Sequence, residues 1–253
     1  YDLLSAWKLS RYAQKVKADV IHGHLTRGAF YSGWASRLSG IPNIATAHAD
    51  NAGKHFGQAH HLIAVSHAVK RFLVNCGYPA QRISVVHHGI PDPQTPSISH
   101  AIARQQLQLQ PHVPCLLMVA RIVPAKGYDT ALHALAQLRH LPWKLLIAGN
   151  HLQDLGPDMQ ALCVRLGLHE RVQFLGLRTD VPLLMQAADL LLAPSRREAL
   201  SLTLIEAAAC HLSAVASRVG GIPEVAHGEP LEFALVLLHG QEVGEKLARV
   251  VVV

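Results

Sequence analysis

Short apolar segments alternate with helical segments along most of this chain, and this alternation restricts the fold more than any other feature. Strands are predicted at 19–22, 42–47, 62–65, 83–86, 115–120, 144–148, 172–176 and 189–193. Helices are predicted between them, at 1–17, 27–38, 67–75, 98–109, 128–140, 159–166, 181–187 and 200–209. Strands that alternate with helices form parallel sheets with right-handed crossover connections. The sequence therefore predicts an α/β protein.

A stretch rich in turn residues divides this pattern into two parts. Pro91, Pro93 and Pro96 lie between the fourth predicted strand and an isolated predicted helix. Prolines at such density are typical of linkers. We therefore predict a first domain at 1–91, a linker at 92–112 and a second domain at 113–253. A chain of 253 residues is long enough for two small domains.

The overall charge restricts the partners. The chain has 23 basic and 17 acidic residues, a formal net charge of +6 and a pI near 9.3. This balance suits an anionic ligand or an anionic membrane surface. The basic residues are scattered and aromatic residues make up only 5% of the chain, so we expect no nucleic-acid partner. No apolar run approaches the roughly 18 residues of a membrane-spanning helix.

Cysteine and histidine offer potential metal ligands, but their spacing does not favour a metal site. The histidines include the pairs at 22 and 24, 60 and 61, and 87 and 88, yet none forms a helical His-x3-His arrangement beside an acidic residue. The cysteines lie far apart, without paired spacing, at Cys76, Cys115, Cys163 and Cys210. We therefore expect no metal centre and no disulfide framework, and we place the protein in the reducing cytoplasm.

Polar side chains follow several predicted strands. His24, His48, Ser66 and His88 lie at the carboxyl ends of strands in the first domain, where parallel α/β sheets bind ligands. Histidines in such loops also cap helices or turns, so a purely structural role stays open. We favour a functional role for His48 and a structural one for His22, which is predicted to be buried within its strand.

A second group of polar residues follows the strand predicted at 115–120. Arg121 and Lys126 lie five residues apart on one loop, and Gly127 precedes the next helix. A guanidinium and an ammonium placed in this way suit a diphosphate. Two solvated cations on a surface loop are the alternative.

The stretch from Pro194 to Glu224 carries two carboxylates eight positions apart. Glu206 lies within the helix predicted at 200–209, and Glu198 precedes it. At about 100° per residue, both carboxylates can face the start of the helix, where free N–H groups and the helix dipole suit a phosphate. A carboxylate deeper in the helix can accept hydrogen bonds from sugar hydroxyls. A surface helix with two solvated glutamates remains the alternative.

The ordered pattern in this stretch resembles a known signature. Pro-Ser-x-x-Glu198, seven residues, Glu206-Ala, and then Val-Gly-Gly-Ile-Pro-Glu224 resemble the signature of retaining GT-B glycosyltransferases, and more narrowly that of glycosyltransferase family 4 (group 1). Val-Ala-Arg121-x4-Lys126-Gly is similar to the phosphate-binding segment of that family. Segments at 19–24, 46–48, 63–66 and 85–90 resemble the second half of its N-terminal domain.

The resemblance implies a fold and an activity. The fold would be two Rossmann-like doubly wound parallel-sheet domains (GT-B), the first incomplete, because the first strands and the closing helix of the family are not matched. The activity would be transfer of a sugar, with retention, from a nucleotide-diphosphate sugar to an alcohol acceptor. A glycan or a lipid-linked glycan of polysaccharide biosynthesis would be that acceptor. No metal or other cofactor is implied, and peripheral contact with the inner face of a membrane is an option.

The resemblance also assigns roles to individual residues. Arg121, Lys126 and the helix start would stabilise the departing diphosphate, Glu198 would orient the donor sugar and His48 would contact that sugar. Glu206 would hold the ribose, and the base would pack near the turn after 172–176. The predicted catalytic residues are therefore His48, Arg121, Lys126 and Glu198. The predicted nucleotide-sugar-binding residues are Gly127, Leu175, Ser201, Leu202 and Glu206.

Some positions depart from the family pattern and leave alternatives open. His88 occupies a position where asparagine is usual, while His211 and Ser213 replace a glycine and a proline in the turn after the helix. We expect His211 to cost stability or to shift that turn, because glycine supplies backbone freedom after a helix. A GT-B nucleotide-sugar epimerase and a non-catalytic nucleotide-sugar-binding fragment remain the competing functions.

Overall fold

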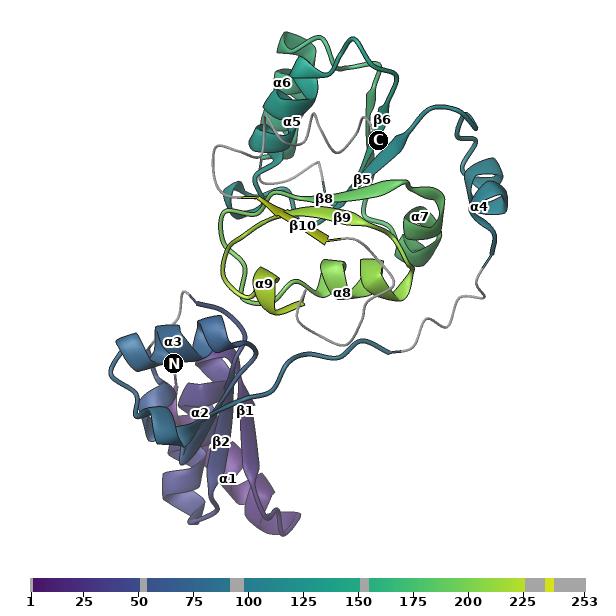
Figure 1. Ribbon diagram of the computed structural model, residues 1–253. Helices are drawn as coiled ribbons and strands as arrows, with labels where there is room; N and C mark the ends of the chain where they lie inside the picture. Colours follow the sequence, from purple (N-terminus) through teal and green to yellow (C-terminus); the bar gives the residue numbers. More distant parts are fainter. Residues whose placement is uncertain (1, 51–53, 92–97, 151–154, 226–234, 239–253) are drawn as a thin grey trace. The chain divides into compact units, whose positions relative to one another are not determined.

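The computed structural model describes residues 2–50, 54–91, 98–150, 155–225 and 235–238 (Figure 1). These residues form two compact units, made mainly of residues 1–88 and of residues 89–253. Each unit contains one parallel sheet with helices packed on it. Part of the predicted linker, residues 92–97, lies outside the described residues.

The first unit contains a four-stranded sheet. The strands β1 (Ile21–His24), β2 (Asn43–Ala47), β3 (His61–Ala64) and β4 (Ile83–Val85) follow one another in the order β1-β2-β3-β4. All three pairings between them are parallel. The helices are α1 (Leu3–Lys15), α2 (Leu25–Ser39) and α3 (His67–Asn75), with short 3-10 turns at Phe56–Gln58 and Ala80–Arg82. The predicted α/β alternation is therefore confirmed in this unit.

Helix α1 packs through a different face from the one its sequence indicated. We expected its large apolar residues to form the buried side, but Leu3, Trp7 and Tyr12 are each more than half exposed. The buried residues of this helix are Ala6, Ser10 and Ala13. Small side chains allow α1 to lie close to α2, and this close approach decides which face is buried.

The second unit contains a six-stranded parallel sheet. Its strands are β5 (Cys115–Val119), β6 (Lys144–Ala148), β7 (Val172–Gly176), β8 (Leu190–Ala193), β9 (Ala214–Ser217) and β10 (Leu235–Leu238). They lie in the order β10-β9-β8-β5-β6-β7 (Figure 1), so the direction of strand addition reverses between β5 and β8. Ligands of doubly wound sheets bind at such a reversal, beyond the carboxyl ends of the strands.

The helices of this unit are α4 (His100–Gln106), α5 (Tyr128–Gln137), α6 (Gly156–Arg165), α7 (Val181–Ala187), α8 (Leu202–Ala209) and α9 (Ile222–Val225), with a 3-10 turn at Pro124–Lys126. Strand β5 is buried on both faces. Leu116 packs into a core with α5 and α6, and Leu117 packs into a second core with α7 and α8. A strand covered on both faces reads as a continuous apolar run, which is why β5 was predictable.

Strand β9 was not predicted. Its four residues, Ala214–Ser217, are small and carry no periodic pattern, and only pairing with β8 and β10 makes them a strand.

Among the described residues, none of the helices has both the length and the apolar character needed to cross a bilayer.

Candidate functional site

The loops that follow β5 and β8 are joined to each other at the point where the strand order reverses. The backbone N–H of Arg196 donates a hydrogen bond to the carbonyl oxygen of Ala125 at 2.8 Å, and the N–H of Arg197 donates to the same oxygen at 3.3 Å. The first loop carries Arg121 and Lys126. The second leads into α8. The fold therefore brings the predicted phosphate-binding loop to the segment that precedes Glu206.

Gly127 allows the two loops to approach this closely. Its φ of +66° lies in the left-handed region, and a Cβ atom there would be 2.0 Å from the carbonyl oxygen of Pro194. A side chain at this position would push the loops apart. The phenol of Tyr128 donates to the carbonyl oxygen of Ala120 at 2.8 Å and anchors the other end of the same loop. Gly127, which was predicted to bind the nucleotide sugar, thus also has a steric role, because it lets the two loops lie close together.

An ion pair that the sequence did not reveal ties the loops together. The guanidinium of Arg196 donates to both carboxylate oxygens of Asp129, at 2.9 Å and 2.7 Å, and to the carbonyl oxygen of Pro124 at 3.0 Å. The hydrogen bonds from Arg196 lower the pKa of Asp129. The two residues are 67 positions apart, so no local sequence signal could have paired them.

The two predicted cations occupy different environments on this loop. Arg121 follows β5 and is exposed, whereas Lys126 is partly buried at the end of the 3-10 turn, directly before Gly127. Both therefore lie on the carboxyl side of the sheet at the reversal point, which is the position that a diphosphate site requires.

Helix α8 is fixed to the same edge of the sheet. Ser201 is its N-cap and accepts a hydrogen bond from the N–H of Leu204 at 3.4 Å. The hydroxyl of Thr203 donates to the carbonyl oxygen of Val119, the last residue of β5, at 3.1 Å. Ser201 is buried and its hydroxyl serves the helix cap, whereas Leu202, the first helical residue, is partly exposed. Ser201 therefore supports ligand binding mainly by stabilising the start of α8, and its own hydroxyl is used by the helix cap.

The two predicted carboxylates differ in their surroundings. Glu206 lies inside α8 and is partly buried, and this burial raises its pKa. Glu198 lies in the loop between β8 and α8, as predicted, and the helix begins at Leu202, two residues later than expected. The argument from helical spacing between the two glutamates is therefore wrong. Their relation depends on the path of the loop and not on helix geometry.

The turn after β7 was predicted to lie near the base of the nucleotide, with Leu175 as a binding residue. Leu175 is partly buried and packs against the core. Gly176 turns the chain with a φ of +72°, and the side chain of Leu177 is 85% exposed. The side chain of Leu175 therefore contacts the core while remaining partly accessible, and Leu177 provides most of the apolar surface at this turn.

In the first unit, His48 follows β2 and lies within a row of histidines. Its Nε2 is 2.9 Å from Nδ1 of His24, and its Nδ1 is 3.1 Å from Nε2 of His88. The prediction that His22 is buried in β1 is wrong. His22 is exposed on the same face as His24, and its Nε2 lies 2.7 Å from the hydroxyl of Thr46. Burial, followed by the neighbouring histidines, lowers the pKa of His48.

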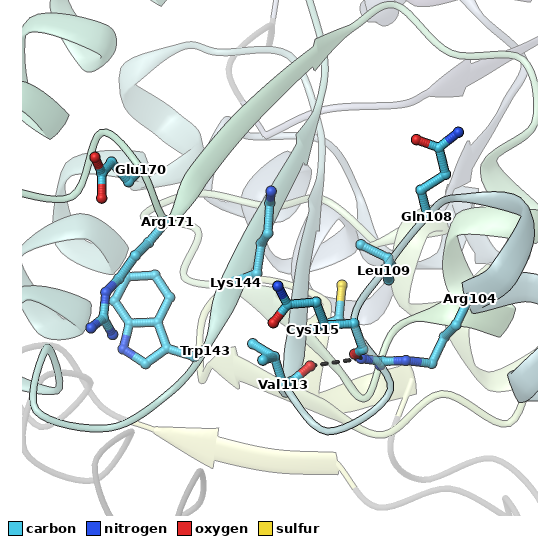
Figure 2. Close-up of a pocket in the computed structure, with 10 residues that line it drawn as sticks. Arg104, Gln108, Leu109, Val113, Cys115, Trp143, Lys144, Glu170 and Arg171 are labelled. Atoms are coloured by element: carbon cyan, nitrogen blue, oxygen red, sulfur yellow. Dashed lines mark hydrogen bonds between the residues drawn. The ribbon is translucent and has the colours of Figure 1, made fainter.

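A pocket lies at the amino-terminal ends of the strands in the second unit, away from the predicted site, and its residues have a structural role (Figure 2). It encloses about 270 Å³ where β5 and β6 begin, and its lining includes Arg104, Trp143 and Lys144. Arg104 is buried and donates to the carboxylate of Asp189 at 2.8 Å and to the carbonyl oxygen of Val113 at 2.7 Å. These bonds attach the segment after α4 to the sheet. None of the predicted site residues lines this pocket.

Comparison with known proteins agrees with this arrangement. Residues 113–251 match the family described as "Glycosyl transferases group 1", and residues 1–92 match "Glycosyltransferase Family 4". Crystal structures of the Anabaena protein HepE are similar to the chain. The complex with UDP-glucose has a TM-score of 0.82 and 25% identity over 98% of this chain and 72% of HepE. A glycosyltransferase from Rickettsia africae, at 22% identity and a TM-score of 0.81, shares the fold.

Curated relatives are named D-inositol 3-phosphate glycosyltransferase. The protein from Mycobacterium sp. strain KMS is 33% identical over 90% of this chain, and that from Mycobacterium bovis is 32% identical over 90% of it. The chain spans 57% and 52% of the lengths of these two relatives. The family matches cover both parts of the chain, and the two parallel sheets and the position of the predicted donor loops agree with them. The chain therefore belongs to glycosyltransferase family 4, group 1, and has the GT-B fold.

Proposed function

We propose that the chain is the donor-binding part of a retaining glycosyltransferase that moves a sugar from a nucleoside diphosphate to a hydroxyl group of a glycan or lipid-linked glycan. The observation that carries this proposal is the hydrogen bond between Arg196 and Ala125. It joins the loop that carries two cations to the loop that leads into α8. HepE is described in complex with UDP and with UDP-glucose, so UDP is the first nucleotide to test.

The site has the features needed to stabilise a departing diphosphate. Arg121, Lys126 and the start of α8 provide positive charge or N–H groups where negative charge develops, and such fixed donors contribute most when they need no rearrangement. Glu206 lies deeper in α8, where its carboxylate can accept hydrogen bonds from ribose hydroxyls. We further propose that the cations make a divalent metal unnecessary, and that any contact with a membrane is peripheral.

Isothermal titration calorimetry on the 253-residue chain tests the donor site directly. We expect UDP to bind, UMP to bind more weakly, and Lys126→Ala to lose most of the preference for UDP. Arg139→Ala, an exposed cation outside the site, is the matched control and should bind like the wild type. Equal binding of UDP and UMP would remove the diphosphate site from the proposal.

A transfer assay on the intact gene product then separates the competing functions. We expect Lys126→Ala to lower kcat by about 10²–10³, the usual effect of one preorganised donor. EDTA should leave the rate unchanged, and NMR of the product should show the anomeric configuration of the donor. An epimerised sugar formed without acceptor would support the epimerase. Binding without transfer would support the non-catalytic module.

A further inference from the structure

Three imidazoles of the first unit form one continuous row. His24 is the last residue of β1, His48 follows β2 and His88 lies after β4, so three strands each contribute one ring. The contacts run from Nδ1 of His24 to Nε2 of His48, and from Nδ1 of His48 to Nε2 of His88. The rings of His48 and His88 are stacked with centroids 5.0 Å apart. Both nitrogens of the central ring are therefore occupied by the outer rings.

Proton counting shows what this arrangement allows. A neutral imidazole has one N–H donor and one acceptor, so neutral His48 can donate to one neighbour only and must accept from the other. The row then exposes an acceptor at one end and a donor at the other. The end atoms are Nε2 of His24 and Nδ1 of His88. If His48 becomes protonated, it donates to both neighbours and both ends become donors.

One end of the row opens into a cavity. A space of about 350 Å³ is lined by His24 and His48 together with Arg27 and Phe56. His88 does not line it. A ligand in this cavity therefore meets the His24 end of the row, while the nitrogens of His48 are already hydrogen-bonded to other histidines.

We propose that His24, rather than His48, contacts a substrate hydroxyl in this cavity, and that His48 and His88 are positioning residues that set the proton on His24. This assignment rests on the proposed glycosyl transfer. Nε2 of His24 accepts the hydroxyl proton while Nδ1 of His24 gives its proton to Nε2 of His48. Nδ1 of His48 gives its proton to Nε2 of His88, and Nδ1 of His88 releases one proton to water. One proton enters and one leaves, and each ring is neutral before and after.

The groups around the row favour the neutral state. His22 lies against His24, with ring centroids 4.1 Å apart, and adds a further titratable imidazole. Arg27 from α2 lines the same cavity and adds positive charge. Asp50, two residues after His48, is the acidic group closest to it in sequence. Partial burial, followed by the neighbouring rings of His88, His24 and His22, lowers the pKa of His48. Protonation of His48 therefore requires a lower pH than is usual for a histidine, and once His48 is protonated the row can no longer accept a proton.

NMR of the histidine rings in the 253-residue chain tests the row without any assay of transfer. We expect the titration of the His48 ring to depend on the rings that are hydrogen-bonded to it. His88→Asn, which restores the residue usual in the family, should move the titration midpoint of His48 upward because a like charge is removed. His61→Asn is the matched control, since His61 contacts Ser84 outside the row. A titration midpoint of His48 that His88→Asn leaves unmoved would overturn the proposal.

Kinetics of the intact enzyme supply the second readout. We expect His24→Gln to lower kcat about 10²-fold, as for loss of an acid–base group, without changing the affinity for UDP. His88→Asn should move the acidic limb of the pH–rate profile to higher pH, which a purely structural role would not do. A wild-type kcat for His24→Gln would overturn the assignment and leave the donor site intact. Absence of UDP binding would instead count against the proposed function, and the NMR result would be unaffected.

Discussion

The backbone N–H of Arg196 lies 2.8 Å from the carbonyl oxygen of Ala125 and donates a hydrogen bond to it. The two residues belong to the loops after β8 and β5, which are neighbouring strands in the sheet although they are distant in the chain. This contact lies where the order of strands reverses. It gives the loop that carries Arg121 and Lys126 a fixed position beside the segment leading into α8.

Replacement of Gly127 by alanine should separate these loops. Gly40→Ala is the matched control, because Gly40 has a φ of +76° but nothing within 4 Å of an added Cβ, whereas at Gly127 the Cβ would meet Pro194. We expect about 1–2 kcal/mol of destabilisation from backbone strain alone at Gly40 and a larger loss at Gly127. Urea unfolding measures both. Equal losses would show that the loops are not held in close contact.

Arg104 should matter more to stability than Arg196. Arg104 is buried and its guanidinium bonds to Asp189, Gln110 and Val113. Arg196 forms an ion pair whose partners are both more than a third exposed. We expect Arg104→Met to lower the free energy of unfolding by about 2–3 kcal/mol and Arg196→Met by at most about 1 kcal/mol. Thermal or urea unfolding of the two variants provides the comparison, and the reverse ranking would contradict this account.

Glu206 should reduce stability at neutral pH while it supports binding. Burial raises its pKa in the folded protein, so folding favours the protonated form. The stability that protonated Glu206 contributes is fully present below its pKa in the unfolded chain. This stability is lost as the pH rises through the pKa that Glu206 has in the folded protein. Glu206→Gln should therefore match the wild type near pH 4 and exceed it at pH 7 by a few tenths to about 1 kcal/mol, after allowance for solvent screening.

The same variant should lose affinity for UDP if Glu206 holds the ribose. Urea midpoints at both pH values and calorimetry with UDP test the two halves of this prediction. Glu170→Gln is the control, because Glu170 is an exposed carboxylate outside α8. A variant that is less stable than the wild type at pH 7 would contradict the role of burial.

His211 should carry a conformational cost. Its φ of +57° lies in the left-handed region, where the family usually has glycine. The turn at His211 is therefore strained, and β9 begins three residues later, at Ala214. We expect His211→Gly to raise the free energy of unfolding by up to about 1 kcal/mol. Ser213→Gly, at a position without positive φ, should lower it slightly. Loss of stability in His211→Gly would show that contacts of this side chain outweigh the strain.

Much of the fold could be predicted because it depends on local pattern. The bounds of α3, β6, β7 and α7 were predicted to the residue, since each is an apolar or amphipathic run bounded by turn or polar residues. Strand β9 could not be predicted, because the segment Ala214–Ser217 becomes a strand only through its neighbours. The packing face of α1 was also wrong, because close approach to α2 selects small side chains rather than large ones.

The candidate site likewise has features that the sequence predicted and features that only the structure revealed. The amino-acid order by itself determined the α/β class, the residue types suited to a diphosphate and the family signature, since these are properties of spacing along the chain. Only the tertiary structure decided that Arg196 binds Asp129 and that His24, His48 and His88 form one row. These relations join residues from different strands and loops. Sheet order brings them together, and sheet order cannot be read from spacing along the chain.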